Sequence, residues 1–302
     1  MKMIALTFLF ILNVYSQSWI DEWQNAIVSI GVTDSLQYKS QNQILYKKYF
    51  RVVGTGVLFY IKIDSHPIPA LVTAKHVFYS PEENWEPEAI NLRFASDETK
   101  PIDEYFGFSI PLISQNKRTW FSHPDSSVDL ACFPLIATNI IRNSGIKVIA
   151  YQSIATNEDL YQGAKVFVFG YPGAVGMEFW TKAILREGII AWVPPDNKNV
   201  GKILIDCEVF PGNSGGPVFK VPSGIDKYGN FQSGGKIQFI GIVSQRRLSS
   251  TDVRMGNQEI VDPKGNKLHS FESIGIGVIA PSIRVSELLD MINTEIQKQL
   301  EH

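Results

Sequence analysis

The stretch DCEVFPGNSGGPVF, residues 206–219, decides between two folds that share the pattern Gly-x-Ser-x-Gly. In an α/β-hydrolase, such as a lipase or an esterase, this pattern lies on a sharp turn between a strand and a helix. Here Ser214 is followed by GGPVFKVPSG, in which Pro217 and a short apolar run predict a turn and then a strand. The stretch therefore favours a β protein, and an esterase on an α/β-hydrolase fold is the weaker alternative.

The rest of the chain carries the same pattern. Between residues 26 and 279, short runs of β-branched and aromatic residues are separated by clusters of Gly, Pro, Asn, Asp and Ser, which predicts an all-β fold. Seven of these runs are predicted to be strands: AIVSIGV (26–32), GVLFYIKI (56–63), ALVTA (70–74), DLACFPL (129–135), KVFVFGY (165–171), KILIDCEVF (202–210) and KIQFIGIVS (236–244).

The last 20 or so residues differ from this pattern. Apolar side chains recur there at helical spacing, at Val285, Leu288, Leu289, Ile292 and Ile296. This spacing predicts a helix over residues 282–302 that packs on the body of the protein.

Length and composition limit the class of protein. A chain of 302 residues with 44% hydrophobic and 12% aromatic content can bury a sizeable core in one large β domain or two small ones. The formal net charge is only −2, from 28 Lys and Arg against 30 Asp and Glu. The sequence therefore has no basic footprint for nucleic acid and no single-sign field to steer a charged partner.

The N-terminus, MKMIALTFLFILNVYSQS, has the features of a secretory signal. Lys2 precedes an apolar run over residues 3–14, and small or polar residues follow, which predicts cleavage after Ser16. The run is shorter than the roughly 20 apolar residues that span a bilayer, so a retained anchor is the weaker alternative. We expect an exported protein with no stable membrane span, and the sequence leaves periplasmic and fully secreted locations open.

The two cysteines, Cys132 and Cys207, are too few for a disulfide scaffold or a zinc site of cysteine pairs. Each lies in an apolar run, which predicts buried packing. Neither has an activating base beside it in the sequence, which argues against a thiol nucleophile. Whether the two pair with each other is left open.

Among the five histidines, His76 is the candidate for chemistry. The stretch LVTAKHVF places it at the end of an apolar strand-like run, where a rigid element can hold an imidazole, although a structural role is the alternative for a single histidine there. His66 and His123 each stand between Ser and Pro in a predicted turn and are expected to be solvated. His269 lies in a polar stretch, and His302 is terminal.

A serine hydroxyl is a poor nucleophile at neutral pH, so a neutral imidazole must take its proton and a carboxylate must orient that imidazole. Asp129 opens the run DLACFPL, at the point where a loop enters a strand. Asp125 is the rival acid, but it lies inside a polar turn. The hypothesis is a set of His76, Asp129 and Ser214.

Seven blocks of sequence point to one family: GTGVLF (54–59), LVTAKHV (71–77), DLACFPL (129–135), VFVFGYPG (166–173), DCEVFPGNSGGPVF (206–219), FIGIVS (239–244) and IGIGVIAPS (274–282). With these blocks in this order, the chain resembles the trypsin-like (chymotrypsin-fold) serine proteases, and the HtrA-like bacterial branch more than the digestive enzymes. The TAKHV and GNSGGP blocks are the specific ones.

The resemblance implies a fold of two packed antiparallel six-stranded β-barrels, over residues 17–147 and 148–281, with the helix of residues 282–302 on the second barrel. It implies an exported serine endopeptidase that cleaves polypeptides through an acyl-enzyme, with no cofactor or metal. His76 would be the general base and acid, Asp129 its orienting carboxylate and Ser214 the nucleophile. The backbone N–H groups of Gly212 and Ser214 would form the oxyanion hole.

Two departures from the family pattern stand out. Digestive zymogens carry Asp just before the serine, whereas this chain has Asn213, so activation by an ion pair to a new N-terminus is not expected. HtrA-like proteins usually continue into a PDZ domain, whereas this chain ends in its helix, so assembly through such a domain is not expected. A monomer is favoured, and the oligomeric state is left open.

The specificity pocket is the least determined part of the site. The resemblance assigns Glu208, Ser244, Gln245 and Gly275 to it. Glu208 stands six residues before Ser214, where an acidic pocket floor would attract Lys or Arg. Strand alternation can also turn Glu208 away and leave a small apolar pocket. A binding protein that keeps the fold without chemistry is the other alternative, and the intact set of His, Asp and Ser argues against it.

Overall fold

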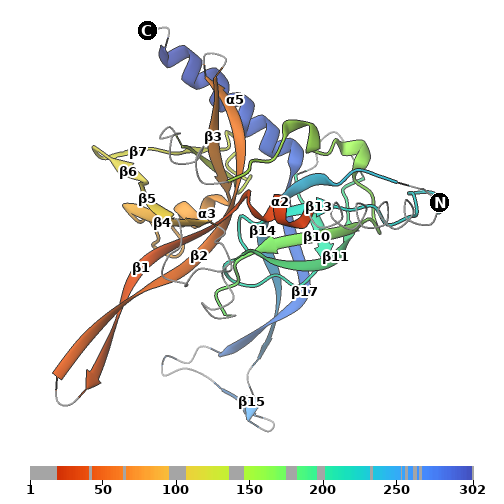
Figure 1. Ribbon diagram of the computed structural model, residues 1–302. Coiled ribbons are helices and arrows are strands. Elements are labelled where there is room, and N and C mark those ends of the chain that lie inside the picture. The colour runs from red at the N-terminus through yellow and green to blue at the C-terminus, as the bar shows by residue number, and fades with distance from the viewer. Residues whose placement is uncertain are drawn as a thin grey trace, which may run out of the picture.

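The computed structural model describes residues 19–40, 43–63, 66–94, 107–135, 146–174, 182–195, 201–231, 234–252, 254–255, 258–260, 264 and 267–300. The predicted signal peptide, residues 1–16, and His302 lie outside these ranges. The predicted fold class is confirmed, because the described chain is mostly antiparallel strand with a closed barrel, a second curved sheet and a long C-terminal helix (Figure 1).

The first sheet has seven strands in the order β5-β4-β1-β2-β3-β9-β8. Their bounds are β1 (Ile27–Ser40), β2 (Gln43–Ile63), β3 (His66–Thr73), β4 (Ala89–Phe94), β5 (Gly107–Pro111), β8 (Phe121–Ser122) and β9 (Ala131–Pro134). A helix, α2 (Trp19–Gln24), precedes the sheet, a helical turn, α3 (Lys75–Phe78), follows β3, and β6 (Ile113–Ser114) and β7 (Lys117–Arg118) form a small hairpin. Within the described ranges no strand pairing joins β5 to β8, so this sheet is a half-barrel.

The second sheet is a closed barrel of six strands in the order β10-β11-β12-β17-β14-β13. Their bounds are β10 (Lys165–Gly170), β11 (Ile184–Trp192), β12 (Ile203–Asp206), β13 (Pro217–Lys220), β14 (Gln238–Asp252) and β17 (His269–Pro281). Two short 3-10 helices, η2 (Tyr151–Ser153) and η3 (Asn157–Asp159), come between β9 and β10 along the chain, and β15 (Arg254–Met255) pairs with β16 (Gln258–Glu259). All seven runs that the sequence predicts to be strands overlap one of these strands.

The sequence of each strand explains how deeply it lies. In β3, Ala70 and Val72 enter one apolar cluster and Leu71 enters another, because successive side chains of a strand point to opposite faces. A strand that is covered on both faces has a continuous apolar run, as PALVT shows. The strand that leads to His76 is therefore held rigidly on both sides.

The predicted C-terminal helix is confirmed as α5 (Ser282–Leu300), but it contacts more of the protein than the sequence suggests. Its stripe of Val285, Leu288, Leu289 and Ile292 is fully buried. It contacts β14 and β17 of the barrel, as expected, and also β2 and β9 of the first sheet. The sequence pattern shows only that one face of the helix is apolar, and this face is wide enough to cover both sheets.

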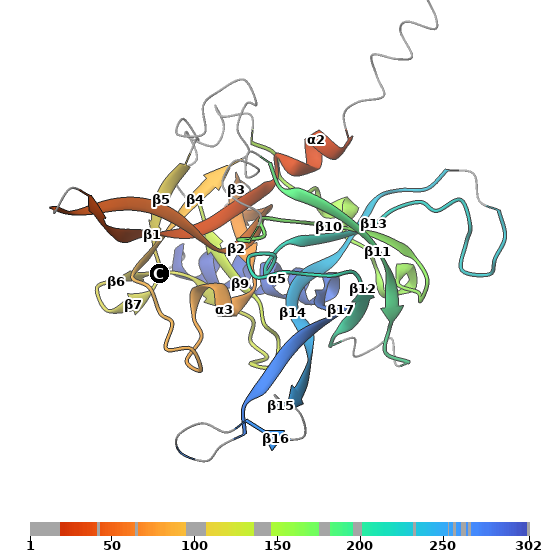
Figure 2. The same cartoon turned by 90° about the horizontal axis from the view of Figure 1, so that it is seen from below.

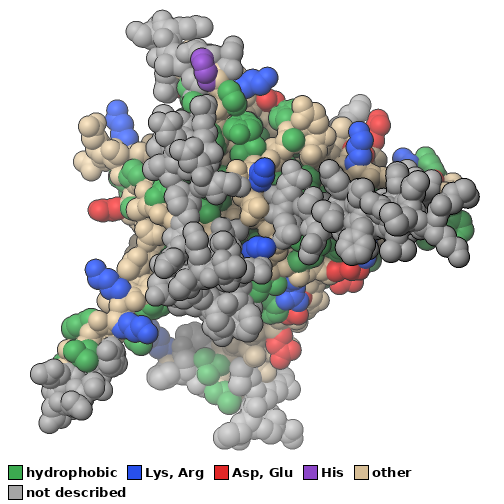
Figure 3. Space-filling model, in the orientation of Figure 1, with side chains coloured by type: hydrophobic (Ala, Val, Ile, Leu, Met, Phe, Trp, Pro, Cys, Tyr) green, Lys and Arg blue, Asp and Glu red, His purple; other side chains and the backbone are tan. Residues whose placement is uncertain are grey.

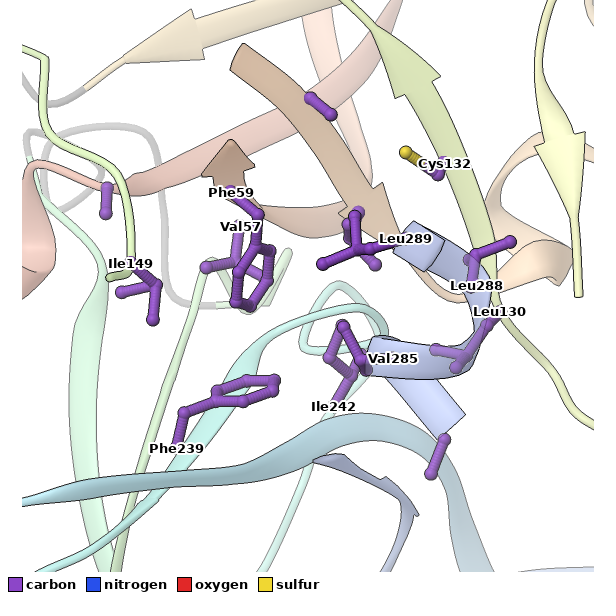
Figure 4. Close-up of a cluster of buried hydrophobic side chains, with 14 of the residues drawn as sticks. Val57, Phe59, Leu130, Cys132, Ile149, Phe239, Ile242, Val285, Leu288 and Leu289 are labelled. Carbon is purple, nitrogen blue, oxygen red and sulfur yellow. The ribbon is translucent and has the colours of Figure 1, made fainter. Parts of the chain in front are cut away.

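A single apolar cluster joins the two sheets beneath this helix. Figure 4 shows Val57 and Phe59 of β2, Phe239 and Ile242 of β14, and residues of α5 in this cluster. Phe59 and Phe239 meet edge to face, with their ring centroids 5.1 Å apart. The half-barrel and the barrel therefore share part of their core, which fixes the position of one against the other. The predicted domain limits, 17–147 and 148–281, stay a prediction.

Two pairs of strands run beyond the body of the protein (Figures 1 and 2). One is the β1–β2 hairpin, and the other is the ribbon of β14 and β17, which stay paired as far as Asp252 and His269. On the face in Figure 3, basic and acidic side chains both occur among the described residues. No helix in the described part of the chain is both long and apolar enough to cross a membrane.

Cys132 and Cys207 are both free and buried, which confirms their predicted packing. Burial raises the pKa of the Cys132 thiol, and burial is also the main reason why the pKa of Cys207 is raised. A raised pKa keeps a thiol protonated and unreactive at neutral pH.

The prediction for His123 is wrong. Its side chain is 2% exposed and lies against α5, where Nε2 is 3.2 Å from Oε2 of Glu287. Its Nδ1 accepts the backbone N–H of Asp125 at 3.1 Å, which leaves Nε2 as the nitrogen that faces the Glu287 carboxylate. The local sequence SHP marks a turn correctly but gives no sign of the helix that covers it. His66, by contrast, is exposed as expected, at the start of β3.

Candidate active site

His76 lies on the single helical turn α3, directly after β3. Val77 and Phe78 in this turn are buried in the first sheet's core, which pulls the turn inward. The imidazole stays 37% exposed at the surface. A buried strand and two buried neighbours therefore hold a half-exposed imidazole in place.

Asp129 reaches His76 because β9 pairs with β3, with Ala131 opposite Thr73. Asp129 Oδ2 lies 2.7 Å from His76 Nδ1, and Oδ1 accepts the backbone N–H of His76 at 3.0 Å. A third hydrogen bond, 2.8 Å long, comes from the hydroxyl of Ser244 to Oδ2. These contacts orient the carboxylate and place the Nδ1 hydrogen between the two side chains, which leaves Nε2 as the basic nitrogen.

The pKa values of Asp129 and His76 are shifted in opposite directions, that of the acid down and that of the imidazole up. Burial alone would raise the pKa of Asp129, but the hydrogen bond and charge of His76 and the hydrogen bond from Ser244 outweigh it, so the pKa is lowered. Burial alone would lower the pKa of His76, but the hydrogen bond and charge of Asp129, with a smaller effect of Glu83, raise it overall. At neutral pH Asp129 is therefore a carboxylate that stabilises positive charge on the imidazole.

Ser214 lies on the loop between β12 and β13, whose shape depends on two glycines. Gly212 has φ +98° and Gly215 has φ +85°, values that favour glycine. A Cβ at Gly212 would lie 2.3 Å from Tyr171 O, and one at Gly215 would lie 2.0 Å from Thr55 O. The strand that follows, β13, excludes the helix that an α/β-hydrolase elbow needs, so the esterase alternative is wrong on fold.

Gly54 brings the serine loop close to the histidine turn. A Cβ on Gly54 would lie 2.6 Å from the side chain of Val77 and 3.1 Å from Ser214 O. The N–H of the next residue, Thr55, donates to Ser214 O at 2.8 Å. No hydrogen bond joins Ser214 Oγ to His76, two residues that the structure describes, and contacts of this kind are often loose in unliganded sites.

The backbone N–H groups around Ser214 are of two kinds, those that donate a hydrogen bond and those that do not, which are here called open. The N–H groups of Asn213, Gly215 and Gly216 donate to backbone carbonyls at 2.9, 2.7 and 2.8 Å. Those of Gly212 and Ser214 have no partner within the described ranges. Two open donors beside a serine hydroxyl form a place where an oxyanion can be bound.

The four residues predicted for the specificity pocket lie near one end of the barrel, but their contacts differ. Glu208 follows the end of β12, which pairs with β17 at Ile276, beside Gly275. Gln245 is exposed on β14, opposite Val278 of β17. Ser244 is buried and its hydroxyl bonds to Asp129, so the structure places it with the acid.

The rival carboxylate, Asp125, forms no hydrogen bond with His76, and both residues lie in the described part of the chain. It is exposed in its turn and accepts hydrogen bonds from the backbone N–H and the hydroxyl of Ser127 at 2.9 and 2.7 Å. Across the described ranges, no group of three or more His, Cys, Asp or Glu is placed to hold a metal ion.

The sequence interpretation missed Thr55, which is fully buried next to the serine loop. Its hydroxyl donates to Gly212 O at 2.7 Å and accepts the N–H of Tyr171 at 3.0 Å. The signal was present in the block GTGVLF, where a small polar residue stands between two glycines inside an apolar strand. It also missed the hydrogen bond between Ser244 and Asp129, for which the sequence has no local signal.

Comparison with known proteins gives one family and several solved structures. Residues 54–224, more than half of the chain, match the family model described as a trypsin-like peptidase domain. A structure of the HtrA-type protease AlgW with a decapeptide is 16% identical with a TM-score of 0.47, over 94% of this chain and 66% of that one. An AlgW variant with a decapeptide is 17% identical with a TM-score of 0.46, over 92% of this chain and 65% of that one. The same variant with a tripeptide is 18% identical with a TM-score of 0.45, over 91% of this chain and 62% of that one.

This chain therefore spans less than two thirds of the length of those structures. No curated protein matches it.

Proposed function

Because the chain belongs to the trypsin-like peptidase family, we propose that it is a serine endopeptidase that cleaves polypeptides through an acyl-enzyme. The observation that carries the proposal is the geometry around His76. Its ring is held by a partly buried carboxylate at 2.7 Å, next to a glycine-shaped loop that presents Ser214 and two open amides. His76, Asp129 and Ser214 are the proposed catalytic residues.

In the first half of the reaction, Ser214 Oγ attacks the carbonyl carbon of the scissile peptide bond while its proton passes to His76 Nε2. Asp129 stabilises the imidazolium that forms. The carbonyl oxygen becomes an oxyanion that accepts the N–H groups of Gly212 and Ser214. When the C–N bond breaks, His76 gives its proton to the leaving amine, and the acyl group stays on Ser214.

In the second half, a water molecule loses a proton to His76 Nε2 and its oxygen attacks the acyl carbon. The bond to Ser214 Oγ then breaks, and His76 returns the proton to that oxygen. Each oxyanion donor of this kind is worth about 2.7 to 4 kcal/mol of transition-state stabilisation. No step requires a cofactor.

The family relation leaves the residue before the scissile bond open between Lys or Arg and small apolar side chains. Glu208 is half-buried after β12, and within the described residues it forms no ion pair with Arg246 or Arg247, which are exposed. An acidic group that forms no ion pair with either of these arginines at that end of the barrel supports a basic substrate residue. From the N-terminal sequence we also propose export of the mature protein.

The proposed function is tested by mapping cuts in an unbiased peptide mixture by mass spectrometry, with the Ser214→Ala variant alongside. We expect cuts by the wild type that are absent with the variant. Lys or Arg before the cut bond would implicate Glu208 in substrate binding. Small residues at that position would instead indicate a small apolar pocket. Equal cutting by both proteins would reject Ser214 as the nucleophile. If the wild type also makes no cuts and a fluorophosphonate does not label Ser214, the fold serves binding.

The raised pKa of His76 predicts the pH dependence of cleavage. The general base must be neutral before it accepts the serine proton, so kcat/KM should rise with pH and reach half its maximum above the pKa of free histidine. The measurement is kcat/KM from pH 5 to 9, since the profile of kcat/KM reports the free enzyme. A midpoint below that of free histidine would contradict the ion pair with Asp129.

A further inference from the structure

The hydroxyl of Thr55 bonds to two backbone groups of the barrel at once. Thr55 Oγ1 donates to Gly212 O at 2.7 Å and accepts the N–H of Tyr171 at 3.0 Å, and both hydrogen bonds are buried. Thr55 is 0% exposed and lies on β2 of the half-barrel. This one hydroxyl therefore ties the first sheet to two segments of the second, the serine loop and the segment after β10.

Peptide geometry shows what these bonds control. In a trans peptide the C=O and N–H groups point in opposite directions, and the described chain has no cis peptide bond. A hydrogen bond that holds a carbonyl therefore also sets the direction of the N–H group in the same peptide. The amide of Gly212 shares its peptide with Pro211 O, which accepts the N–H of Gly173 at 3.0 Å.

Thr55 supports the peptides on both sides of Gly212, one directly and one through a neighbouring segment. The peptide before Gly212 is held by Gly173, two residues after Tyr171, whose N–H is bound to Thr55 Oγ1. The peptide after Gly212 is held directly, because its carbonyl accepts the hydroxyl of Thr55. Gly212 itself offers little resistance to rotation, since glycine without a Cβ has a wide choice of φ and ψ.

Ser214 provides the second open amide, and this amide is held within its own loop. It shares a peptide with Asn213 O, which accepts the N–H of Gly216 at 2.8 Å. The two donors of the proposed oxyanion hole thus have different supports. Loss of the Thr55 hydroxyl would affect the Gly212 donor and leave the hydrogen bond that supports the Ser214 donor in place.

We propose that Thr55 is a positioning residue for the oxyanion hole. Its hydroxyl holds the Gly212 carbonyl directly and holds Tyr171, whose segment bonds to the peptide that carries the Gly212 N–H, and through both contacts it keeps that N–H open to an oxyanion. This inference rests on the proposed function, because it assigns a support to that same site. It also makes the active form of the loop depend on contact between the two sheets, since Thr55 belongs to the half-barrel and Gly212 to the barrel.

The test compares Thr55→Val with Thr55→Ser. Valine keeps the shape of threonine but replaces the hydroxyl by a methyl group, which leaves the Tyr171 N–H and the Gly212 carbonyl without this partner. We expect Thr55→Val to lower kcat by about 10² to 10³-fold, the cost of one oxyanion donor, with KM changed by less than about threefold. Thr55→Ser keeps the hydroxyl and should keep kcat within about threefold of the wild type.

Ser282→Ala is the matched control. Ser282 is another buried hydroxyl that donates to a backbone carbonyl, that of Ala155 at 2.8 Å, and it lies at the start of α5, outside the serine loop. Its loss should lower the thermal midpoint without lowering kcat at a temperature where the variant is folded. An equal fall of kcat in Thr55→Val and Ser282→Ala, or in Thr55→Val and Thr55→Ser, would overturn the proposal.

A second measurement separates this proposal from the proposed function. Hydrogen exchange followed by mass spectrometry in the full chain reports on residues 206–219 whether or not the protein cleaves peptides. We expect this segment to exchange about tenfold faster in Thr55→Val than in Thr55→Ser, which corresponds to about 1.4 kcal/mol. Equal exchange would overturn the role of Thr55 even in an active enzyme, and a wild type that cuts nothing would overturn only the proposed function.

Discussion

Replacement of Ser214 by alanine is expected to lower kcat by about 10⁶-fold, the largest effect of any single change in this protein. The reason is the loss of the nucleophilic oxygen, without which no acyl-enzyme forms. KM should change little, because the amides of Gly212 and Ser214 are backbone groups that alanine keeps. The measurement is steady-state kinetics on a peptide found in the cut mapping, together with labelling by a fluorophosphonate.

Ser250→Ala is the control for this result. Ser250 is exposed on the part of β14 that runs beyond the barrel, so its hydroxyl can be removed without disturbing the loop. It should leave kcat and labelling at the wild-type level. More than about one per cent of wild-type kcat in Ser214→Ala would be incompatible with a serine nucleophile at this position.

Asp129→Asn is expected to have the second largest effect, a fall in kcat of about 10⁴-fold with the fold intact. An amide in place of the carboxylate can donate to His76 Nδ1, which would put the ring hydrogen on Nε2, where the proposed mechanism needs a lone pair. Removal of the negative charge also removes the main cause that raises the pKa of His76. The remaining activity should therefore reach its half-maximum at a lower pH than in the wild type.

Asp125→Asn is the matched control, because Asp125 is the other acid near this turn and is exposed, with its carboxylate bound to Ser127. Its kcat should stay within about threefold of the wild type, as expected of a surface change away from the reacting groups. The measurement is kcat/KM as a function of pH for the wild type, Asp129→Asn and Asp125→Asn. If Asp125→Asn lost activity and Asp129→Asn kept it, the two carboxylates would have to exchange roles.

Some features of the site can be predicted from the sequence because their causes are local. Alternating or continuous apolar runs predict strands wherever they occur, and the run before His76 shows that the histidine follows a rigid element. The glycines around Ser214 predict a backbone that a Cβ would hinder, which the positive φ of Gly212 and Gly215 bears out. The family resemblance then predicts which acid accompanies the histidine.

Other features depend on partners far apart in the chain. Ser244 and Asp129 are separated by 115 residues, Thr55 and Gly212 by 157, and His123 and Glu287 by 164. A polar side chain in a sequence does not show which distant group it will meet, because strand register and the docking of the sheets decide this. For this reason the sequence predicts a solvated His123, which the structure overturns, and it gives no sign of the hydrogen bond from Ser244 to Asp129.

The amino-acid sequence is enough to predict the all-β class, the order of the strands along the chain, the apolar stripe of the C-terminal helix and the three residues proposed for catalysis. These follow from the size, polarity and backbone preferences of neighbouring residues. Three further features become visible only in the folded protein: α5 contacts both sheets, Ser244 bonds to Asp129, and Thr55 bonds to the loop of Ser214. The physical reason is that a buried polar group must find its hydrogen-bond partner in whatever segment packs against it.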